Sequence, residues 1–509
     1  MRLLLGIGLI STFFYLTIAA EALETDVLIL GGGMSGVSAA HTLNSLNVTD
    51  FLLLEARHEL GGRVQNAKIG DISVEFGANW IQGLGSNPIW LLAEKYGVKN
   101  RYSNWSNIAY LSEKNGWNDE ELEEAVTRFE EVVFDAASKE AGRRKELGLA
   151  DLSMKAGLRL VGWDAKTPAE KAAEYFSHDW EMAETPLESS FIGTIESYNE
   201  SFVESGNGDN NIVVDPEGYK QVVIKHAAEI PDFDQKVRFN EVVINITYSG
   251  EDVTVSTSSG LVVKARRAIC TFSLGVLQHN DVSFYPPLPE AKRDAIMNFH
   301  LATYTKIFAR FPRKFWNDTE FILYADRDDR GHWPIWQPLD IPGFYPGSGV
   351  LFATLTGDYA YRAEAQTDEE LQENMMEQLR FMYGPDIPDP IEFKFPRWTL
   401  DPLFRGSFTN WGAGVTEKQQ QALAAPVGGD TGLRRDDTLW FAGEHTSRKY
   451  FGYLHGAYWE GRLAAHRIAD CIRSDGCTES FATGLVRRQA GEMEAPSGER
   501  RRMRKRMWE

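Results

Sequence analysis

The chain of 509 residues contains only three cysteines, which is too few for a fold built on disulfide bonds. Cys471 and Cys477 are close enough in sequence to form one bridge at the end of the last predicted helix. Cys270 lies in a strand-like run and is expected to be a buried free thiol. The sequence also lacks internal repeats and low-complexity segments, so a repeat architecture is not expected.

Long apolar runs are absent except at the start of the chain. There, Arg2 precedes an apolar run from Leu3 to about Ile18, and alanines follow at 19, 20 and 22. This pattern predicts a cleaved secretory signal over residues 1–22. A membrane anchor is the alternative, but the run is shorter than the roughly 20 residues that a bilayer requires. No stable membrane span is therefore expected.

Export would place the protein in an extracellular or cell-wall compartment, where glycosylation of asparagine is possible. Five N-x-S/T triplets offer acceptor sites, at Asn47, Asn104, Asn199, Asn245 and Asn317. Each triplet alone is weak evidence, but together with the leader they indicate a secreted glycoprotein.

Positive charge is in short supply, since the formal net charge is −20. An acidic body repels phosphate, so nucleic acid is not an expected partner. It attracts cationic substrates instead, modestly and in a salt-dependent way. The exception is a basic run at the end of the chain, from Arg500 to Arg506, and residues 479–509 are predicted to form a disordered basic tail.

The length calls for two large units, and the order of predicted elements indicates how they are arranged. A strand at 26–30, a helix to about residue 46 and a strand at 51–54 form a βαβ opening, as in a doubly wound α/β sheet. Residues 118–190 are mainly helical, and Asn118 with Glu121 predicts a capping box. Strands follow at 236–247, 252–256, 262–271, 303–311 and 438–442. One helix is predicted to be capped by Thr367 with Glu370, and another begins at about Leu454.

A glycine-rich turn follows the first strand directly. Gly31, Gly33 and Gly36 fit the G-x-G-x-x-G pattern, which permits a tight turn, close approach to a diphosphate and tight helix packing. The helix that follows directs its positive end at the phosphates. Glu55 ends the second strand 24 residues after Gly31, near the spacing of an acid that accepts hydrogen bonds from ribose. Dinucleotide binding is therefore predicted.

Three further motifs resemble the flavin-containing amine oxidase family. They are Glu55-Ala56-Arg57 with Gly61-Gly62-Arg63, then Phe76-Gly77-Ala78-Asn79-Trp80, and finally Phe441-Ala442-Gly443-Glu444-His445-Thr446 with Gly452-Tyr453-Leu454-His455-Gly456-Ala457. The resemblance covers roughly residues 25–475 and is strongest to plant and fungal extracellular polyamine oxidases. It implies FAD as cofactor and no metal.

The resemblance also implies a fold. We expect an α/β protein with a Rossmann-like FAD-binding domain of the glutathione-reductase/amine-oxidase type and an inserted α+β substrate domain. The FAD-binding domain would comprise residues 23–100, 215–285 and 396–478, and the substrate-binding domain residues 101–214 and 286–395. The oligomeric state cannot be derived from the sequence.

Residue roles at the cofactor follow from the same resemblance. Arg63 would neutralise the diphosphate, Val243 would contact the adenine end through its backbone, and Glu444 would approach the ribityl chain. Aromatic side chains would wall the flavin and the amine, where cation–π attraction holds the substrate: Trp80, Trp398, Phe408 and Tyr453.

The candidate catalytic residues lie on the substrate side. Strand alternation puts Tyr304, Lys306 and Phe308 on one face, so Lys306 is expected to be buried with a lowered pKa. In the family this lysine binds a water at the flavin. Glu181 matches a family acid that binds a distal ammonium group. Gln82 stands where plant polyamine oxidases carry a glutamate, and this weakens the case for an unmodified polyamine.

These residues predict hydride transfer from a polyamine to FAD, with imine hydrolysis to an aminoaldehyde and reduction of O2 to H2O2. Spermidine, spermine and their N-acetyl derivatives all fit. An oxidase of L-amino acids or of other amines with the same fold is the first alternative, and it would need an arginine for the substrate carboxylate. A secreted flavin-fold binding protein without turnover is the second.

Overall fold

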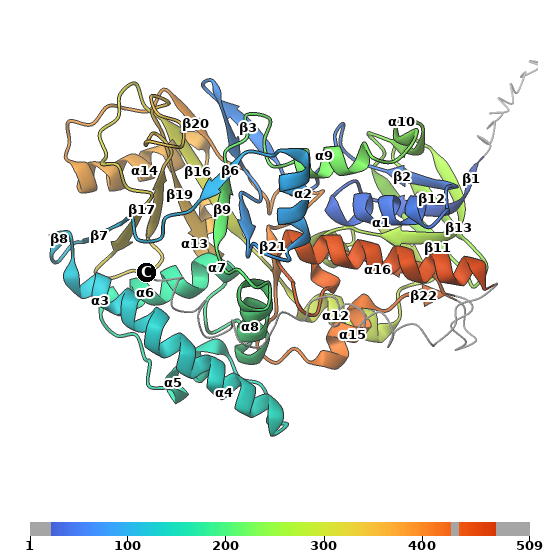
Figure 1. The fold of residues 1–509 in the computed structure, drawn as a ribbon, viewed down its shortest axis with the longest axis horizontal. Coiled ribbons are helices and arrows are strands. Elements are labelled where there is room, and N and C mark those ends of the chain that lie inside the picture. Colours follow the sequence, from blue (N-terminus) through green and yellow to red (C-terminus); the bar gives the residue numbers. More distant parts are fainter. Residues whose placement is uncertain (1–21, 429–436, 475–509) are drawn as a thin grey trace, which may run out of the picture.

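The computed structural model describes residues 22–428 and 437–474. Residues 1–21 of the predicted signal, Cys477 and the predicted basic tail (479–509) lie outside this part. Two large sheets organise the described chain (Figure 1), one on each side of a cavity that runs between them.

The first sheet has nine strands within the described residues, in the order β10-β2-β1-β13-β12-β11-β14, and β23 joins β13 and β22. The strands are β1 (Leu23–Leu30), β2 (Phe51–Leu54), β10 (Val237–Arg238), β11 (Val243–Tyr248), β12 (Val253–Thr257), β13 (Val262–Cys270), β14 (Ser283–Tyr285), β22 (Val427–Gly428) and β23 (Asp437–Phe441). The run β10-β2-β1-β13-β23 is parallel. Where these strands are buried they are apolar, as in Val27–Leu30 of β1, all of β2 and Ala268–Cys270 of β13, which is expected where helices or loops cover both faces.

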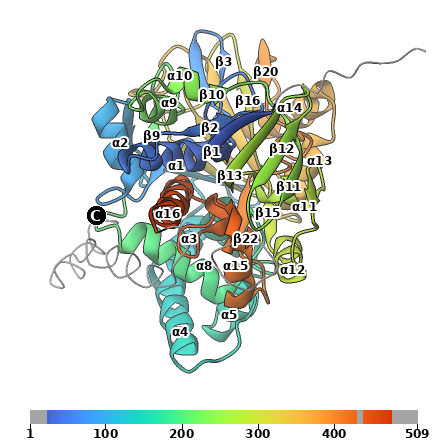
Figure 2. The same ribbon diagram turned by 90° about the vertical axis from the view of Figure 1, so that its right-hand side faces the viewer.

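Two helices from opposite ends of the chain cover one face of this sheet. Helix α1 (Met34–Ser45) packs directly on α16 (Leu454–Arg473), and both views show them side by side (Figures 1 and 2). The contact is close, since Ser38 Oγ donates to the Tyr458 carbonyl at 2.9 Å. A Cβ added at Gly461 would lie 2.0 Å from the Ser35 carbonyl oxygen. Only glycine permits this approach.

The second sheet has the order β20-β16-β19-β18-β17-β7-β8. Its strands are β7 (Ile108–Ser112), β8 (Gly116–Trp117), β16 (Tyr304–Arg310), β17 (Phe321–Ala325), β18 (Ile335–Pro338), β19 (Val350–Thr356) and β20 (Glu392–Lys394). Helices α13 (Gly357–Glu364) and α14 (Asp368–Tyr383) bury apolar side chains against one face. Helices of the region 120–198 pack on the other.

That helical region begins with α3 (Glu120–Arg128), α4 (Phe134–Glu146), α5 (Met154–Leu160) and α6 (Pro168–Glu174). It continues with α7 (Trp180–Met182) and α8 (Phe191–Tyr198). The remaining helices are α2 (Pro88–Tyr96), α9 (Gln221–Ala227), α10 (Phe233–Lys236), α11 (Leu274–Gln278), α12 (Glu290–Asn298) and α15 (Glu417–Ala424).

Three small sheets join the two halves. They are β3 (Asn66–Ile69) with β4 (Ile72–Glu75), β5 (Trp80–Gln82) with β9 (Asn210–Val213) and β6 (Asn100–Tyr102), and β15 (His300–Ala302) with β21 (Phe408–Asn410). The segment 286–302, assigned from sequence to the substrate-binding part, packs instead beside the nine-stranded sheet. The reason is that Ala295 and Ile296 of α12 belong to that sheet's core, and Lys292 donates to the Leu423 carbonyl at 2.7 Å.

Most predicted elements are present, and the mixed α/β fold class is confirmed. The capping box at Thr367 and Glu370 is confirmed. The predicted cap at Asn118 is wrong: Asp119 caps α3, accepting from the amides of Glu121 and Leu122. Asn118 instead has φ 62°, outside the conformation of a cap residue. The strand predicted at 236–247 is divided, because Asn240 is left-handed with φ 60°.

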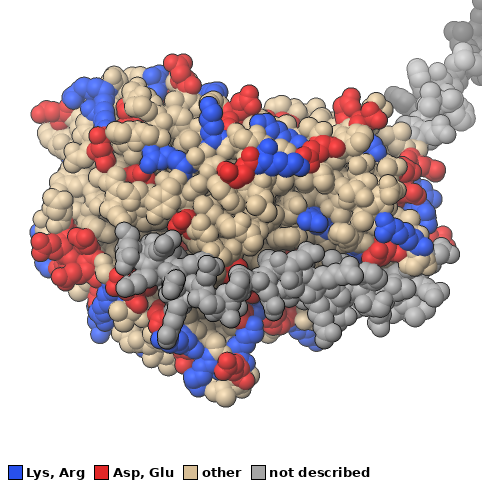
Figure 3. All heavy atoms as spheres, viewed as in Figure 1, with Lys and Arg blue, Asp and Glu red and all other residues tan. Residues whose placement is uncertain are grey.

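Cys270 is a buried free thiol, as predicted. None of the described helices combines the length and hydrophobicity that a membrane crossing requires. On the face shown in Figure 3, acidic and basic side chains are interspersed among broad uncharged areas. Neither charge is gathered into a single patch over the part of this face drawn in colour.

The close contact of α1 and α16 gives a direct test. We expect Gly461→Ala to destabilise the fold by about 1–3 kcal/mol, because its methyl group overpacks the Ser35 carbonyl. Gly142→Ala is the control: this glycine lies within α4 with nothing within 4 Å of the new Cβ, so a gain of about 0.5–1 kcal/mol is expected. Thermal unfolding measures both. Equal melting temperatures for the two variants would contradict this packing.

Candidate active site

A cavity of about 660 Å³ lies between the two large sheets. Stretches far apart in sequence line it, among them 31–35, 54–64, 76–82, 398–409 and 443–457. One end is formed by the glycine-rich turn and Glu55. The other holds the aromatic and acidic residues of the substrate half.

The first end fits a dinucleotide. Gly31, Gly33, Met34 and Ser35 line the cavity where α1 begins. No side chain caps this helix and no acidic residue lies in its first turn, so its leading amides are left for an anion. Among the described residues the buried Ser35 hydroxyl has no hydrogen-bond partner, and a bound phosphate would supply one.

Glu55 closes this end, at 6% exposure. Its carboxylate accepts from the amides of Gly32 at 2.6 Å and Arg57 at 2.7 Å. Burial raises the pKa of Glu55, and these two hydrogen bonds oppose the rise. Val243 lines the cavity at the same end. Glu55 and Val243 would therefore lie beside the ribose and the base of a bound nucleotide.

The middle of the wall depends on Arg63 and Glu444. Arg63 Nη1 donates to Glu444 Oε1 at 2.9 Å and to the Ser407 carbonyl at 2.8 Å. Glu444 also accepts from Thr409 Oγ1 at 2.9 Å and from the Gly452 amide at 2.7 Å. Burial alone would raise the pKa of Glu444, but the charge of Arg63 and the donated hydrogen bonds hold it below its ordinary value.

Aromatic rings form much of the remaining wall. Trp80, Trp398, Phe408 and Tyr453 all line the cavity, as does Tyr304. Tyr453 directly precedes α16 and stacks on His455 with ring centroids 5.0 Å apart. The positive end of α16 therefore opens onto the cavity beside Tyr453.

The reacting end centres on one carboxylate. Glu181 Oε1 accepts from Tyr453 Oη at 2.7 Å and from Gln82 Nε2 at 3.0 Å. Burial raises the pKa of Glu181, while both hydrogen bonds lower it. Trp180 precedes it and meets Trp80 edge to face with centroids 5.5 Å apart. Glu181, Tyr453 and Gln82, which were predicted separately, thus form one hydrogen-bonded group.

Lys306 lies one layer behind the cavity wall. It is 1% exposed, and its Nζ donates to the carbonyl of Gly77, a lining residue. Lys306 is not among the described lining residues. Burial lowers the pKa of Lys306, and the charge of Glu75 opposes this. Glu75 is itself buried with Oε2 unpaired among the described residues, and burial raises its pKa.

The strand face predicted from alternation is present. Phe308 stacks on Phe76 with centroids 5.8 Å apart, Lys306 reaches Gly77, and Tyr304 meets Phe408 at 5.9 Å. The face is turned towards the segment 76–80 and the cavity.

Several lining residues were not found from the sequence. They include Trp105, Met182, Phe404 and Asn210. Trp105 is 5.9 Å from Trp180 between ring centroids, and Phe404 is 5.4 Å from Trp398. Neither belongs to a recognisable motif, since both come from connecting segments. Met182 is the exception, because it is a sequence neighbour of Glu181.

A nucleotide-binding turn joined to an aromatic pocket with a buried acid fits an FAD-dependent oxidase of amines. The chain belongs to the family described as flavin containing amine oxidoreductase, whose family model matches residues 34–469. FAD is its cofactor, and Ser35, Glu55, Arg63 and Glu444 are the residues that would hold it.

Similar proteins agree with this class. Polyamine oxidase 1 of Zea mays is 35% identical over 90% of this chain and 93% of its own length. Polyamine oxidase 7 of rice is 34% identical over 91% of this chain and 99% of its own length. A lysine-specific histone demethylase homologue of rice is 28% identical over 90% of this chain but 58% of its own length. A solved structure of putrescine oxidase with putrescine matches in fold, with a TM-score of 0.71, 20% identity, and 88% of this chain and all of that chain covered.

The buried ion pair of Arg63 and Glu444 gives the second prediction. Arg63→Met leaves a buried carboxylate without its counter-charge, which costs about 3–5 kcal/mol. We expect a lower melting temperature and loss of bound flavin, read from visible absorbance after gel filtration. Adding Glu444→Gln removes the unpaired charge and should restore part of the stability.

Arg101→Met is the matched control for this prediction. Arg101 pairs with Glu320 at 2.7 Å with similar burial, but it lies outside the cavity wall. It should lower stability and leave flavin content unchanged. Full flavin retention by Arg63→Met would contradict the assignment of Arg63.

Proposed function

We propose that the protein oxidises polyamines, taking spermidine, spermine or their N-acetyl derivatives as substrates. The observation that carries this is Glu181, a single carboxylate in the aromatic end of the cavity, held by Tyr453 and Gln82. An anion between aromatic walls suits a substrate with one ammonium group beyond the reacting nitrogen. The similarity to plant polyamine oxidases supports the same class.

The side chains have separate tasks in this proposal. Glu181 binds the distal ammonium group, and Tyr453 orients Glu181 through its hydroxyl. Trp80, Tyr304 and Tyr453 exclude water and direct the carbon beside the amine at the cofactor. When bound, FAD would supply the hydride acceptor, and O2 would be the final oxidant and leave as H2O2. The released imine is then hydrolysed to an aminoaldehyde.

Gln82 bears on which polyamine is preferred. It donates to Glu181 and adds no negative charge. A glutamate at this position would give the reacting end two carboxylates, enough for two ammonium groups. With Gln82, Glu181 alone remains for one ammonium group. A substrate that carries one charge fewer, such as an N-acetylated polyamine, matches this balance.

An L-amino-acid oxidase is less well supported. Its substrate carboxylate would need a cation near Glu181. Arg57 and Arg63 are the arginines among the described lining residues, and both are engaged: Arg63 with Glu444 and Arg57 with Asp401 at 3.7 Å. A binding protein without turnover is less well supported, because Glu55, Arg63 and Glu444 line the cavity and Lys306 is buried directly behind its wall.

We also propose export and glycosylation. The side chains of Asn47, Asn104 and Asn317 are exposed, as an acceptor asparagine must be. Asn199 and Asn245 are only half-buried.

A substrate panel tests the proposed function. Peroxide should form from spermidine or N-acetylspermine and not from leucine. Gln82→Glu adds a second anion beside Glu181, and we expect it to raise the kcat/KM ratio of free spermine to N-acetylspermine about tenfold, or about 1.4 kcal/mol. Gln82→Met serves as the uncharged control. Turnover of leucine alone, or an unmoved ratio, would reject the proposal.

Lys306 gives a pH prediction. We propose that its neutral amine assists the reaction through the Gly77 carbonyl and a bound water. Protonation would then remove activity as the pH falls through the Lys306 pKa. Glu75 is the charge that raises this pKa, so Glu75→Gln should lower it further and move the acidic limb of the activity profile to lower pH.

The measurement is the initial rate of peroxide formation across pH for native enzyme, Glu75→Gln and Lys306→Met. Lys306→Met should be slow and lack that limb. A limb that moves to higher pH in Glu75→Gln, or one that persists in Lys306→Met, would show that another group titrates.

A further inference from the structure

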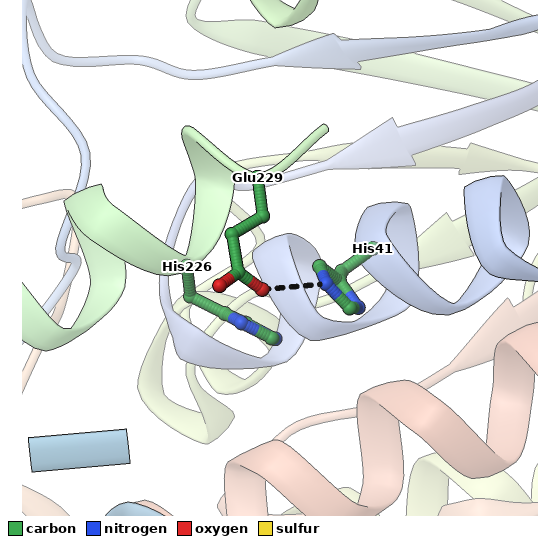
Figure 4. Close-up of side chains that lie close together, drawn as sticks. All are labelled: His41, His226 and Glu229. Atoms are coloured by element: carbon green, nitrogen blue, oxygen red, sulfur yellow. Dashed lines mark hydrogen bonds and ion pairs between the residues drawn. The ribbon is translucent and has the colours of Figure 1, made fainter. Parts of the chain in front are cut away.

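Two histidines and a glutamate converge away from the cavity, where α1 and α9 meet. His41 lies on α1, His226 on α9, and Glu229 just after α9 (Figure 4). His41 Nε2 is 3.1 Å from Glu229 Oε2, and the two imidazoles are stacked with centroids 4.1 Å apart. One ligand atom from each residue lies within 4.8 Å of the others.

This donor set is that of a transition-metal site. Two imidazole nitrogens and one carboxylate oxygen are a known zinc ligand set, with bonds of about 2.0–2.2 Å. The donor atoms need to close by roughly 1 Å, and one imidazole must turn out of the stack, because a metal lies in the plane of each ring that binds it. The side chains of His41 and Glu229 are 31% and 30% exposed, which leaves room for both movements. Tyr96 Oη contacts His226 Nδ1 at 3.1 Å. This contact orients the ring and leaves Nε2 for a metal.

Two cations oppose a metal here. Lys95 Nζ pairs with Glu229 Oε1, and Arg462 acts on both histidines through its charge. The Lys95 side chain is 55% exposed and can turn into solvent, which frees one carboxylate oxygen. Lys95 is thus the group that a metal must displace.

We propose that His41, His226 and Glu229 bind one divalent transition-metal ion of the zinc class. Three protein ligands leave one position for water. The ion would tie α9 to α1, the helix whose first residues line the cofactor cavity, and so stabilise the wall at the dinucleotide end.

Titration of chelator-treated flavin-loaded enzyme with Zn²⁺ tests the proposal by calorimetry and by melting temperature. We expect one saturable site whose occupation raises the melting temperature. Glu229→Gln and His41→Gln should each weaken binding at least tenfold. Lys95→Met should tighten it several-fold, because the competing cation is gone.

His332→Gln is the matched control, since His332 also contacts a carboxylate, Asp326, at 3.0 Å but lies outside the described three-ligand group. It should bind Zn²⁺ like the native enzyme. Absence of saturable binding, or affinity equal to native in Glu229→Gln and His41→Gln, would overturn the proposal. So would weaker binding in Lys95→Met.

Discussion

The buried carboxylate of Glu444 is the constraint on which the cofactor wall depends. It accepts hydrogen bonds from Arg63, Thr409 and Gly452, which come from three distant parts of the chain. A charge at this depth is tolerated only when it is paired and hydrogen-bonded. The same carboxylate therefore fixes three segments relative to one another around one cavity. They are the loop that carries Arg63, strand β21 and the start of α16.

The charged groups at the reacting end, Glu181, Lys306 and Glu75, are also arranged so that they compensate one another. One anion, Glu181, is held inside the cavity, while Lys306, whose pKa is lowered by burial, stays behind the wall and contacts it through the Gly77 carbonyl. The negative charge of Glu75 acts on Lys306 in the opposite direction and raises its pKa. The cavity thus offers negative charge to an ammonium group and shields it from the lysine. This arrangement favours a cationic amine over an amino acid.

Local sequence predicted the parts of the fold that depend on local chemistry. The glycine turn, Glu55 at the end of β2 and the capping box at Thr367 follow from spacing and backbone geometry. The cap of α3 was misplaced by one residue, because Asn118 and Asp119 both suit a cap and tertiary contacts choose between them. Contacts between distant segments could not be predicted from the sequence. Examples are the Lys306–Gly77 hydrogen bond, the packing of Phe404 on Trp398 and the contact of His41 with His226.

The central claim is that an amine bound at Glu181 gives its hydride to FAD in this cavity. Mixing oxygen-free enzyme with spermidine or N-acetylspermine in a stopped-flow spectrometer tests it directly. The account predicts that the visible flavin absorbance bleaches at a rate that saturates with amine, and that Glu181→Gln raises the half-saturating concentration. An absorbance that stays unchanged with both polyamines, or that bleaches only with leucine, would contradict it.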